Sequence, residues 1–455
     1  MVARVVIAGT ASGVGKTTLT VGLATALRRR GLRVAMFKCG PDYLDPGYHA
    51  RAAGAPCHNL DGWMMGRDAV LATFAHAARG ADVALVEGVM GLFDGASPVG
   101  DDGSTAQIAK WLHAPVLLAC DASGMARSLA ALAQGFARFD PELNVAGVIC
   151  NRVGSDAHVQ LLRRALRQPP VLGGLQVHPE LAFPERHLGL RTAEPDALPD
   201  AVFDGWGQRV EAGVDVQAVL DLARSAPALP VVAERTARAP GERCRIGIAF
   251  DQAFHFYYED NLRRLAQLGA RLVRFSPIED ARLPEVDGLY LGGGYPELHA
   301  QALSANAAMR AAIATFAARG GPIYAECGGL MYLGTSIRTV DGATHAMAGV
   351  VPARLRMHDR LQALGYVEVE TRAASVLGAP GLRFRGHQFR YSELELHGPV
   401  DNAYSVRKRR GGDSFAEGYL QGNVLASYVH AHWASNPLVA EGFVETCAAS
   451  AGATR

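Results

Sequence analysis

Cys327 is the residue whose setting most strongly suggests covalent chemistry. The apolar residues 321–325 before it predict a short buried strand, and Gly328 and Gly329 lead into a predicted helix over residues 330–333. A strand, a sharp turn and a helix form the elbow that exposes a nucleophile at the top of an α/β sheet. A helix start behind the thiol is expected to lower its pKa and favour the thiolate. The same pattern also fits a buried structural cysteine.

Histidines that could activate this thiol stand near the end of the chain. Residues 423–428 predict a strand, and His430 and His432 follow it. A thiolate nucleophile needs a histidine that is close in space, though not in sequence. Three glycines, residues 292–294, end another predicted strand over residues 288–291 without a lysine, so they do not form a P-loop. Their bare backbone N–H groups suit an oxyanion hole.

A different chemistry is indicated by residues 9–18, which form a glycine-rich loop ending in Gly-Lys-Thr. Residues 4–8 predict a buried strand before it, and residues 17–30 predict a helix with an apolar stripe after it. In this setting backbone N–H groups and Lys16 bind phosphates, and the Thr17 hydroxyl binds Mg²⁺. The usual first glycine of such a loop is replaced by Thr10, a variant found in the P-loop branch of dethiobiotin synthetase and the partition ATPases.

Polar side chains follow three further predicted strands of the same half. Residues 34–38 lead into a loop with Asp42 and Asp45, and residues 83–86 lead to Glu87, with Asp94 beyond it. Parallel strands end at one edge of a sheet, where ligands bind, so these acids are expected beside the P-loop. Ordinary turn chemistry is the alternative explanation for them. Asn151, directly after a strand over residues 145–150, is expected either to contact adenine or to cap a helix.

The elements that must position these groups alternate between strand and helix along the whole chain. This alternation predicts an α/β fold with two doubly wound parallel-sheet domains. We expect a P-loop domain over residues 1–220, a Pro- and Ala-rich linker over residues 221–243, and a second domain over residues 244–455. A chain of 455 residues is long enough for two such cores.

Composition excludes several classes of protein. The formal net charge of +1 does not indicate a basic surface for nucleic acid or an anionic membrane. No apolar run reaches transmembrane length. The seven cysteines show no CxxC spacing, which argues against a zinc ribbon or a disulfide framework. We therefore expect a cytoplasmic protein.

Several longer segments match known families. A cysteine elbow followed by a late strand and His430 is the order of a class I glutamine amidotransferase, although His432 stands where that class usually carries a glutamate. With residues 40–46 and 87–95 of the P-loop half, the chain resembles the cobyrinate a,c-diamide synthase family over essentially its whole length. Further similar segments are residues 184–190, 253–261, 386–392 and 427–430. Gln388 and Arg390 replace the Glu and His that members often carry, so the role of that segment, corrinoid contact being one candidate, stays open.

The resemblance implies ATP- and glutamine-dependent amidation of the a- and c-carboxylates of a corrin macrocycle through acyl phosphates. Cys327 would be the nucleophile and His430 its base, acting without a third acidic member. The oxyanion would be held by Gly293, Gly294 and Gly328. ATP would be bound by Gly13, Gly15, Lys16, Thr17, Thr18 and Asn151. Mg²⁺ would be bound by Thr17, Asp42 and Glu87, and substrate or phosphoryl transfer would involve Asp45 and Asp94.

The expected partners are therefore the corrinoid, L-glutamine and ATP, with no nucleic acid and no membrane. A homodimer is the assembly considered. The nearest alternatives keep this chemistry and change the macrocycle to hydrogenobyrinate or nickel sirohydrochlorin. Cobyric acid synthase shares both domains but lacks the form of residues 40–46. A partition-type switch ATPase would need no cysteine elbow and typically has a second lysine where this chain has Thr10 and Ala11.

Overall fold

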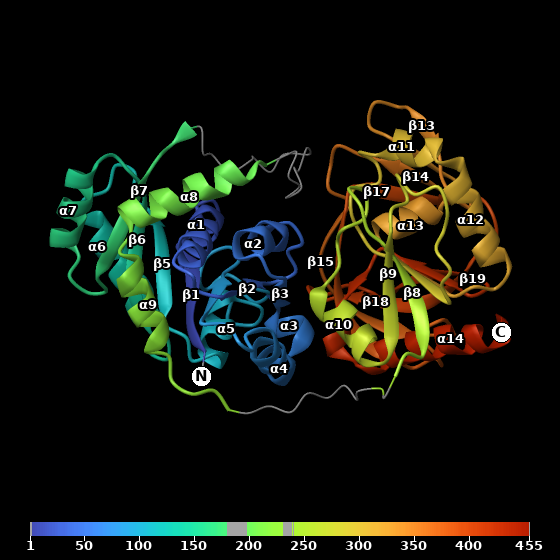
Figure 1. Cartoon of the computed structure of the whole chain (residues 1–455), viewed down its shortest axis with the longest axis horizontal. Coiled ribbons are helices and arrows are strands. Elements are labelled where there is room, and N and C mark those ends of the chain that lie inside the picture. Colours follow the sequence, from blue (N-terminus) through green and yellow to red (C-terminus); the bar gives the residue numbers. More distant parts are fainter. Residues whose placement is uncertain (1, 180–197, 231–238, 240, 455) are drawn as a thin grey trace. The chain divides into compact units, whose positions relative to one another are not determined.

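The computed structural model describes residues 2–179, 198–230, 239 and 241–454, and the chain divides into two compact units, residues 1–233 and 234–455. The segment 184–190, which resembled the family, lies outside the described residues. Each unit contains its own sheet and its own hydrophobic core (Figure 1). None of the helices in the described ranges combines the length and the hydrophobicity that crossing a bilayer needs.

Unit 1 is built on a seven-stranded, entirely parallel sheet with the order β3-β2-β4-β1-β5-β6-β7. Its strands are β1 (Ala3–Gly9), β2 (Val34–Cys39), β3 (Cys57–Leu60), β4 (Val83–Glu87), β5 (Val116–Asp121), β6 (Val145–Val153) and β7 (Val171–Gln176). Its helices are α1 (Lys16–Arg29), α2 (Asp45–Ala53), α3 (Gly62–Met65), α4 (Arg67–Ala77), α5 (Thr105–Trp111), α6 (Ser128–Phe139), α7 (Asp156–Ala165), α8 (Asp200–Gly213) and α9 (Val216–Arg224).

Helices cover both faces of this sheet. The apolar stripe of α1, with Leu19, Leu23 and Leu27, packs on one face of the central strands together with α8 and α9. On the other face, Phe74 of α4 packs against Phe37 of β2 with ring centroids 4.8 Å apart. The strands are buried on both sides, which explains why they read as continuous apolar runs in the sequence.

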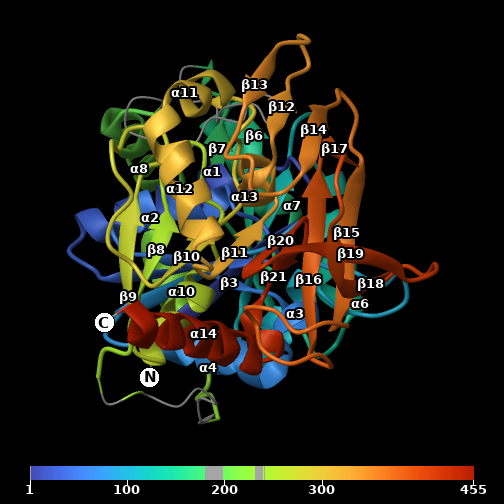
Figure 2. The same cartoon turned by 90° about the vertical axis from the view of Figure 1, so that its right-hand side faces the viewer.

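Unit 2 contains a ten-stranded mixed sheet with the order β21-β16-β15-β18-β19-β20-β11-β10-β8-β9. A second sheet of four strands, in the order β13-β12-β14-β17, places β14 beside β17 (Figure 2). The strands are β8 (Cys244–Ala249), β9 (Ala270–Phe275), β10 (Gly288–Leu291), β11 (Ile323–Glu326), β12 (Ser336–Arg338), β13 (Thr344–Ala346), β14 (Ala353–Met357), β15 (Ala363–Thr371), β16 (Arg383–Arg390), β17 (Ser392–Leu396), β18 (Asp401–Lys408), β19 (Phe415–Gln421), β20 (Val424–Ser427) and β21 (His430–Ala431).

The helices of unit 2 cover the parallel half of the large sheet. They are α10 (Glu259–Gln267), α11 (Ala300–Ala305), α12 (Ala307–Ala318), α13 (Gly328–Leu333), α14 (Leu438–Thr454) and a short 3-10 turn at Trp433–Ser435. Apolar residues of α10 and α14 share one core with β8, and those of α12 and α13 share another with β10 and β11. The parallel strands thus place Cys327 at the carboxyl end of β11, next to the end of β20.

The α/β class and a parallel sheet in each half are confirmed, with one difference in unit 2. In its ten-stranded sheet only β20, β11, β10, β8 and β9 are parallel, because β15, β16, β18 and β19 form antiparallel pairs that the sequence pattern did not reveal. Two local expectations also differ. Residues 45–49 form the start of α2 where we expected only a loop, and α9 extends to Arg224, into the segment expected as a linker.

Candidate functional site

The P-loop of unit 1 connects the end of β1 to the start of α1. Gly13 and Gly15 have φ of 76° and 90°, which side chains other than glycine rarely adopt. A Cβ on Gly15 would also lie 2.1 Å from Nδ2 of Asn151. Asn151 donates from Nδ2 to the carbonyl of Val14 at 2.9 Å. The residue expected to contact adenine therefore also packs directly against the loop that wraps phosphate groups.

The loop after β4 lies on the P-loop. Nζ of Lys16 donates to the carbonyl of Met90 at 2.6 Å and to that of Ala11 at 3.1 Å. Met90 has φ of 51°, so a strained backbone presents that carbonyl. Asp94 accepts the N–H of Gly91 at 3.0 Å and thereby shapes this loop. Lys16 lies where two carbonyl oxygens now hold its ammonium, and phosphate oxygens can replace them.

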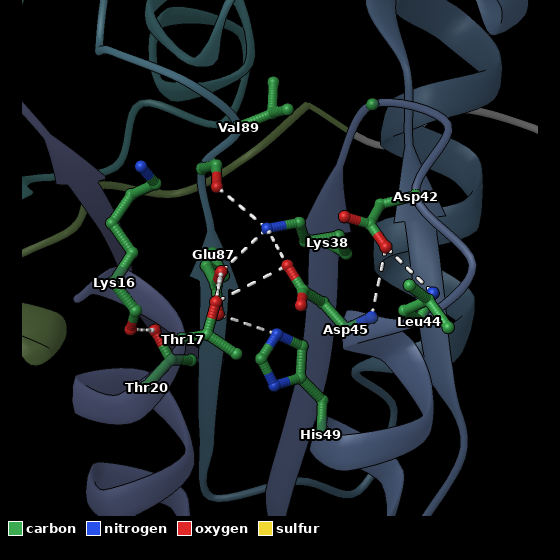
Figure 3. A network of polar contacts seen from close by, with 12 residues as sticks. Lys16, Thr17, Thr20, Lys38, Asp42, Leu44, Asp45, His49, Glu87 and Val89 are labelled. Atoms are coloured by element: carbon green, nitrogen blue, oxygen red, sulfur yellow. Dashed lines mark hydrogen bonds and ion pairs between the residues drawn. The ribbon is translucent and has the colours of Figure 1, made fainter. Parts of the chain in front are cut away.

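A compact charged cluster lies beside the P-loop, at the ends of β2 and β4 (Figure 3). Lys38 extends between Asp45 and Glu87, with Nζ 2.7 Å from a carboxylate oxygen of each. Thr17 donates its hydroxyl to Oε1 of Glu87 at 2.8 Å and lies 3.5 Å from Oδ2 of Asp45. Nε2 of His49 lies 2.8 Å from the other oxygen of Glu87. We name Thr17, Lys38, Asp45, His49 and Glu87 the carboxylate cluster.

The charges within the carboxylate cluster stabilise one another. Burial alone would lower the pKa of Lys38, but Asp45 and Glu87 raise it above its ordinary value. Burial would likewise raise the pKa of Glu87, but Lys38 and His49 hold it below its ordinary value. Glu87 is therefore ionised at neutral pH, although its side chain is fully buried.

The two acids of the loop after β2 have different positions. Asp42 accepts the N–H groups of Leu44 and Asp45 through Oδ1, at 2.8 and 3.1 Å, so it stabilises the start of α2. Asp45, which we assigned to substrate or phosphoryl transfer, is the acid that lies beside Thr17. Lys38 and His49 were missed by the sequence analysis. A lysine in the otherwise apolar strand 34–39 was the available signal, because a buried charge needs a partner.

The oxygens of the carboxylate cluster suit a hard cation. Mg²⁺ is usually held by one or two carboxylates together with substrate phosphates. Thr17, Asp45 and Glu87 supply such a set next to the P-loop. Among the described residues no group of three or more His, Cys, Asp or Glu side chains could hold a metal by itself.

In unit 2, Cys327 occupies the expected elbow between β11 and α13. Its φ is 45° and its ψ is −98°, a strained backbone for a residue with a side chain. A Cβ on Gly329 would lie 2.2 Å from the carbonyl oxygen of Leu291, so the helix can approach β10 only with glycine there. The N–H of Cys327 donates to the carbonyl of Ser427 at 2.7 Å. The elbow is thus fixed to both neighbouring strands.

The expectation of a lowered thiol pKa is wrong for the unliganded site. Burial, with contributions from Glu297 and Glu326, raises the pKa of Cys327 to about 12. The N–H of Gly328 opposes this shift, but α13 has only six residues and its effect is smaller. Burial also lowers the pKa of His430 to about 3. Both groups are therefore neutral at rest.

His430 and the glycine loop lie together beside this elbow. A Cβ on Gly293 would lie 2.4 Å from Cε1 of His430, and one on Gly328 would lie 3.0 Å from the nitrogen of Gly294. The glycine loop therefore touches both His430 and α13, the helix that follows Cys327. Gly293 donates its N–H to the carbonyl of Phe256 at 3.3 Å, whereas no backbone carbonyl in the described ranges accepts the N–H of Gly294. This geometry favours Gly294 and Gly328 over Gly293 as oxyanion donors.

The segment 386–392 also belongs to this site. His387 stacks on His430 with ring centroids 4.9 Å apart, and Sγ of Cys327 lies 3.7 Å from the carbonyl oxygen of Phe389. The guanidinium of Arg390 lies over the ring of Tyr428, 4.5 Å from its centroid. The segment considered for corrinoid contact thus lines the cysteine–histidine site.

Two models of known protein families match this chain, and each match lies mainly in one of the two units. Residues 5–190 match a family model described as the CobQ/CobB/MinD/ParA nucleotide binding domain, and residues 245–438 match the CobB/CobQ-like glutamine amidotransferase domain. The cobyrinate a,c-diamide synthase of Leptospira interrogans is 53% identical over 446 residues, which cover 98% of each chain. The chain belongs to the cobyrinate a,c-diamide synthase family. This result confirms the resemblance predicted from the sequence.

Other members of the cobyrinate a,c-diamide synthase family show the same extent of similarity. The Syntrophotalea carbinolica protein of that name is 52% identical over 98% of each chain, and the Salmonella typhimurium protein is 44% identical over 95% of each chain. The similarity therefore includes both units, with the P-loop in one and the cysteine elbow in the other.

Proposed function

We propose that this protein uses ATP and glutamine to convert the a- and c-carboxylates of cobyrinate to amides in cobalamin biosynthesis. The main support is membership of the cobyrinate a,c-diamide synthase family over nearly the whole chain. A P-loop with a carboxylate cluster and a cysteine elbow with a histidine are both present in this one chain. Those are the two sites that such a reaction requires.

In unit 2, Cys327 would attack the side-chain amide carbon of glutamine. His430 would accept the thiol proton as the C–S bond forms and then donate it to the departing ammonia. The oxyanion would be held by the N–H groups of Gly294 and Gly328. Because both Cys327 and His430 are neutral at rest, the proton would move from the thiol to His430 in concert with attack on the amide carbon. Water then hydrolyses the glutamyl thioester.

In unit 1, a substrate carboxylate would attack the γ-phosphoryl group of ATP, and ammonia would then displace phosphate from the acyl phosphate. A carboxylate is a poor acyl donor until its oxygen becomes part of a good leaving group. Lys16 would neutralise the phosphate oxygens, and Thr17, Asp45 and Glu87 would hold Mg²⁺, which supplies charge neutralisation when bound. Lys38 would keep Glu87 ionised and hold both carboxylates in place.

The rest of the proposal concerns partners and location. Small-molecule substrates account for both sites, and we propose a cytoplasmic enzyme without a nucleic acid partner. Cobyrinate is the proposed acceptor because the named relatives carry that substrate in their names. Hydrogenobyrinate and nickel sirohydrochlorin would require the same chemistry and are outcomes of the test.

The test is mass spectrometry of the macrocycle after incubation with enzyme, ATP, Mg²⁺ and glutamine. Cobyrinate, hydrogenobyrinate and nickel sirohydrochlorin are offered in separate reactions. Two amides on cobyrinate support the proposal, and two amides on another macrocycle alone replace the acceptor. ATP hydrolysis without amidation of any of the three would contradict the proposed reaction.

A further inference from the structure

His430 has a ring partner on the neighbouring strand. His387 of β16 is the residue directly opposite His430 of β21 in the antiparallel register. The two rings stack with centroids 4.9 Å apart and an interplanar angle of 17°. Both side chains are buried, being 6% and 2% exposed. Directly opposed residues are the closest side-chain neighbours in such a pair, so His387 covers one face of the base.

His387 is in turn held by Tyr258. The Tyr258 hydroxyl and Nδ1 of His387 form a buried hydrogen bond of 3.1 Å. Tyr258 is the residue before α10, and its ring also packs against that of His432, 4.5 Å between centroids. The His387 ring is therefore held at its face by His430 and at its edge by Tyr258, which lies at the start of α10.

The same turn of α10 fixes the backbone that carries the base. Asn261 donates from Nδ2 to the carbonyl of Ala431 at 2.8 Å and accepts the N–H of Trp433 at 2.9 Å. Segments 253–261 and 386–392, to which the proposed function gave no role, thus meet around His430. Asp260 on this turn pairs with Arg263 and Arg264 at 2.5 and 2.6 Å, and its charge also opposes the lowering of the pKa of His432 by burial.

We propose that Tyr258 and His387 are positioning residues for His430, in place of the carboxylate that class I amidotransferases carry where this chain has His432. A general base needs a partner that fixes its ring while it takes and returns a proton. In this protein the partner is His387, which contacts the face of the His430 ring. When His430 takes the proton of Cys327, the imidazolium faces the π-system of His387, an attractive arrangement when water is excluded.

His387 can keep this role throughout the cycle because it stays neutral. Burial, together with His430 and His432, lowers the pKa of His387 well below its ordinary value. The Tyr258 hydroxyl then has a constant hydrogen-bond partner in Nδ1. The inference rests on the proposed glutaminase role of Cys327 and adds the residues that orient its base.

The test compares Tyr258→Phe, His387→Phe and the double variant in the full-length protein. Tyr258→Phe removes only the hydroxyl, and His387→Phe keeps a ring but removes Nδ1. Tyr404→Phe, which removes another buried hydroxyl in the same unit, is the matched control. Glutamine-dependent and ammonia-dependent amidation are measured side by side, with kcat and KM for each nitrogen source.

We expect each single variant to lower the glutamine-dependent kcat about 10- to 100-fold, part of the roughly 10²–10⁴-fold that general acid–base catalysis supplies. KM for glutamine should change less than about threefold, and ammonia-dependent turnover should stay at the wild-type rate. Because the two residues act as one unit, the double variant should be no slower than the slower single variant. Tyr404→Phe should resemble the wild type.

Three results would overturn the inference. They are wild-type kcat in both single variants, equal losses with glutamine and ammonia, or independent losses that multiply in the double variant. Cys327→Ser separates this failure from failure of the proposed function. If Cys327→Ser still uses glutamine, the glutaminase role itself is wrong. If Cys327→Ser is inactive with glutamine while Tyr258→Phe and His387→Phe are both unaffected, only the positioning role is wrong.

Discussion

Oε1 of Glu326 accepts the N–H of Ala431 at 3.0 Å, so the residue before Cys327 is bonded to the residue after His430. The Tyr324 and Tyr290 hydroxyls also donate to this carboxyl group, at 2.8 and 3.0 Å. The bond connects the end of β11 to β21, strands that are far apart in the order of the sheet. A single buried side chain thereby fixes the spacing of the cysteine and histidine segments.

Glu326→Ala should destabilise unit 2, because it leaves three buried donors without an acceptor. Each buried donor left without an acceptor costs about 1–3 kcal/mol of folding free energy. We therefore expect Glu326→Ala to lose about 3 kcal/mol or more of stability. Glu326→Gln is the matched control, because its carbonyl can still accept from Ala431 and Tyr324. Thermal unfolding of both variants measures the difference. Equal melting temperatures for Glu326→Ala and the wild type would show that the carboxyl group does not hold the two segments.

Glu326 should also make stability depend on pH. Burial raises the pKa of Glu326 to about 7, so the folded protein binds a proton that the unfolded chain releases above its ordinary pKa of 4.5. This contribution is fully present below that ordinary value and is lost as pH rises through about 7. The melting temperature of Glu326→Gln, relative to wild type, should therefore increase between pH 5 and about pH 8.5. A constant difference across this range would mean that Glu326 is ionised in the folded state.

Cys327 should be an unreactive thiol in the free enzyme. With its pKa raised to about 12 by burial, its alkylation by iodoacetamide should be slow near neutral pH and should still be rising at about pH 10. Peptide mass spectrometry follows Cys327 separately from the other six cysteines, which are also buried. Rapid alkylation at pH 7 would instead support the thiolate that the helix start was first expected to stabilise.

Lys38→Met should destabilise unit 1, because Asp45 and Glu87 would keep their buried charges without the ammonium between them. Breaking a buried ion pair in this way costs about 3–5 kcal/mol. Mg²⁺ with ATP should restore more stability in this variant than in the wild type, since its charge replaces the one removed. Lys110→Met is the control, because the Lys110 side chain is 23% exposed, compared with 3% for Lys38. Equal melting temperatures for Lys38→Met and Lys110→Met would contradict the structural role of Lys38.

The sequence predicted the strands that carry the chemistry better than the contacts around them. Strands β1, β2, β4, β10 and β11 are largely apolar runs with Gly, Lys or acidic residues at or just beyond their ends, and the pattern alone located them. The distinction between Asp42 and Asp45 depends on a helix that starts inside a Gly/Pro-rich loop, which masks the start signal. The neutral state of Cys327 depends on burial by segments distant in sequence, which local pattern does not encode.

The contacts of His430 could not be predicted from the sequence for the same reason. His387 and His430 are 43 residues apart, and they meet only because β16 and β21 pair within the antiparallel half of the sheet. That half was not predicted, since its strands are interrupted by charged residues and short turns. The motif containing His387 was recognisable as a family segment, but only the strand pairing shows which side chain it supports.

Lys16→Ala should stop amidation from either nitrogen source, because the transferred phosphoryl group loses its charge partner. We expect a fall in kcat of at least about 100-fold, as for removal of one donor to a developing charge. Labelling of Cys327 by a glutamine-like diazo ketone should be unchanged, which controls for folding of unit 2. Ammonia-dependent amidation at the wild-type rate would contradict the phosphoryl-transfer role of the P-loop.

The two-site account is tested most directly by the nitrogen-source dependence of Cys327→Ser. The account predicts that glutamine-dependent amidation of the macrocycle is abolished, while ammonia-dependent amidation stays within about twofold of the wild type, because unit 1 is intact. Glutamine-dependent amidation at the wild-type rate, or loss of amidation with both nitrogen sources in a variant that melts like the wild type, would contradict it.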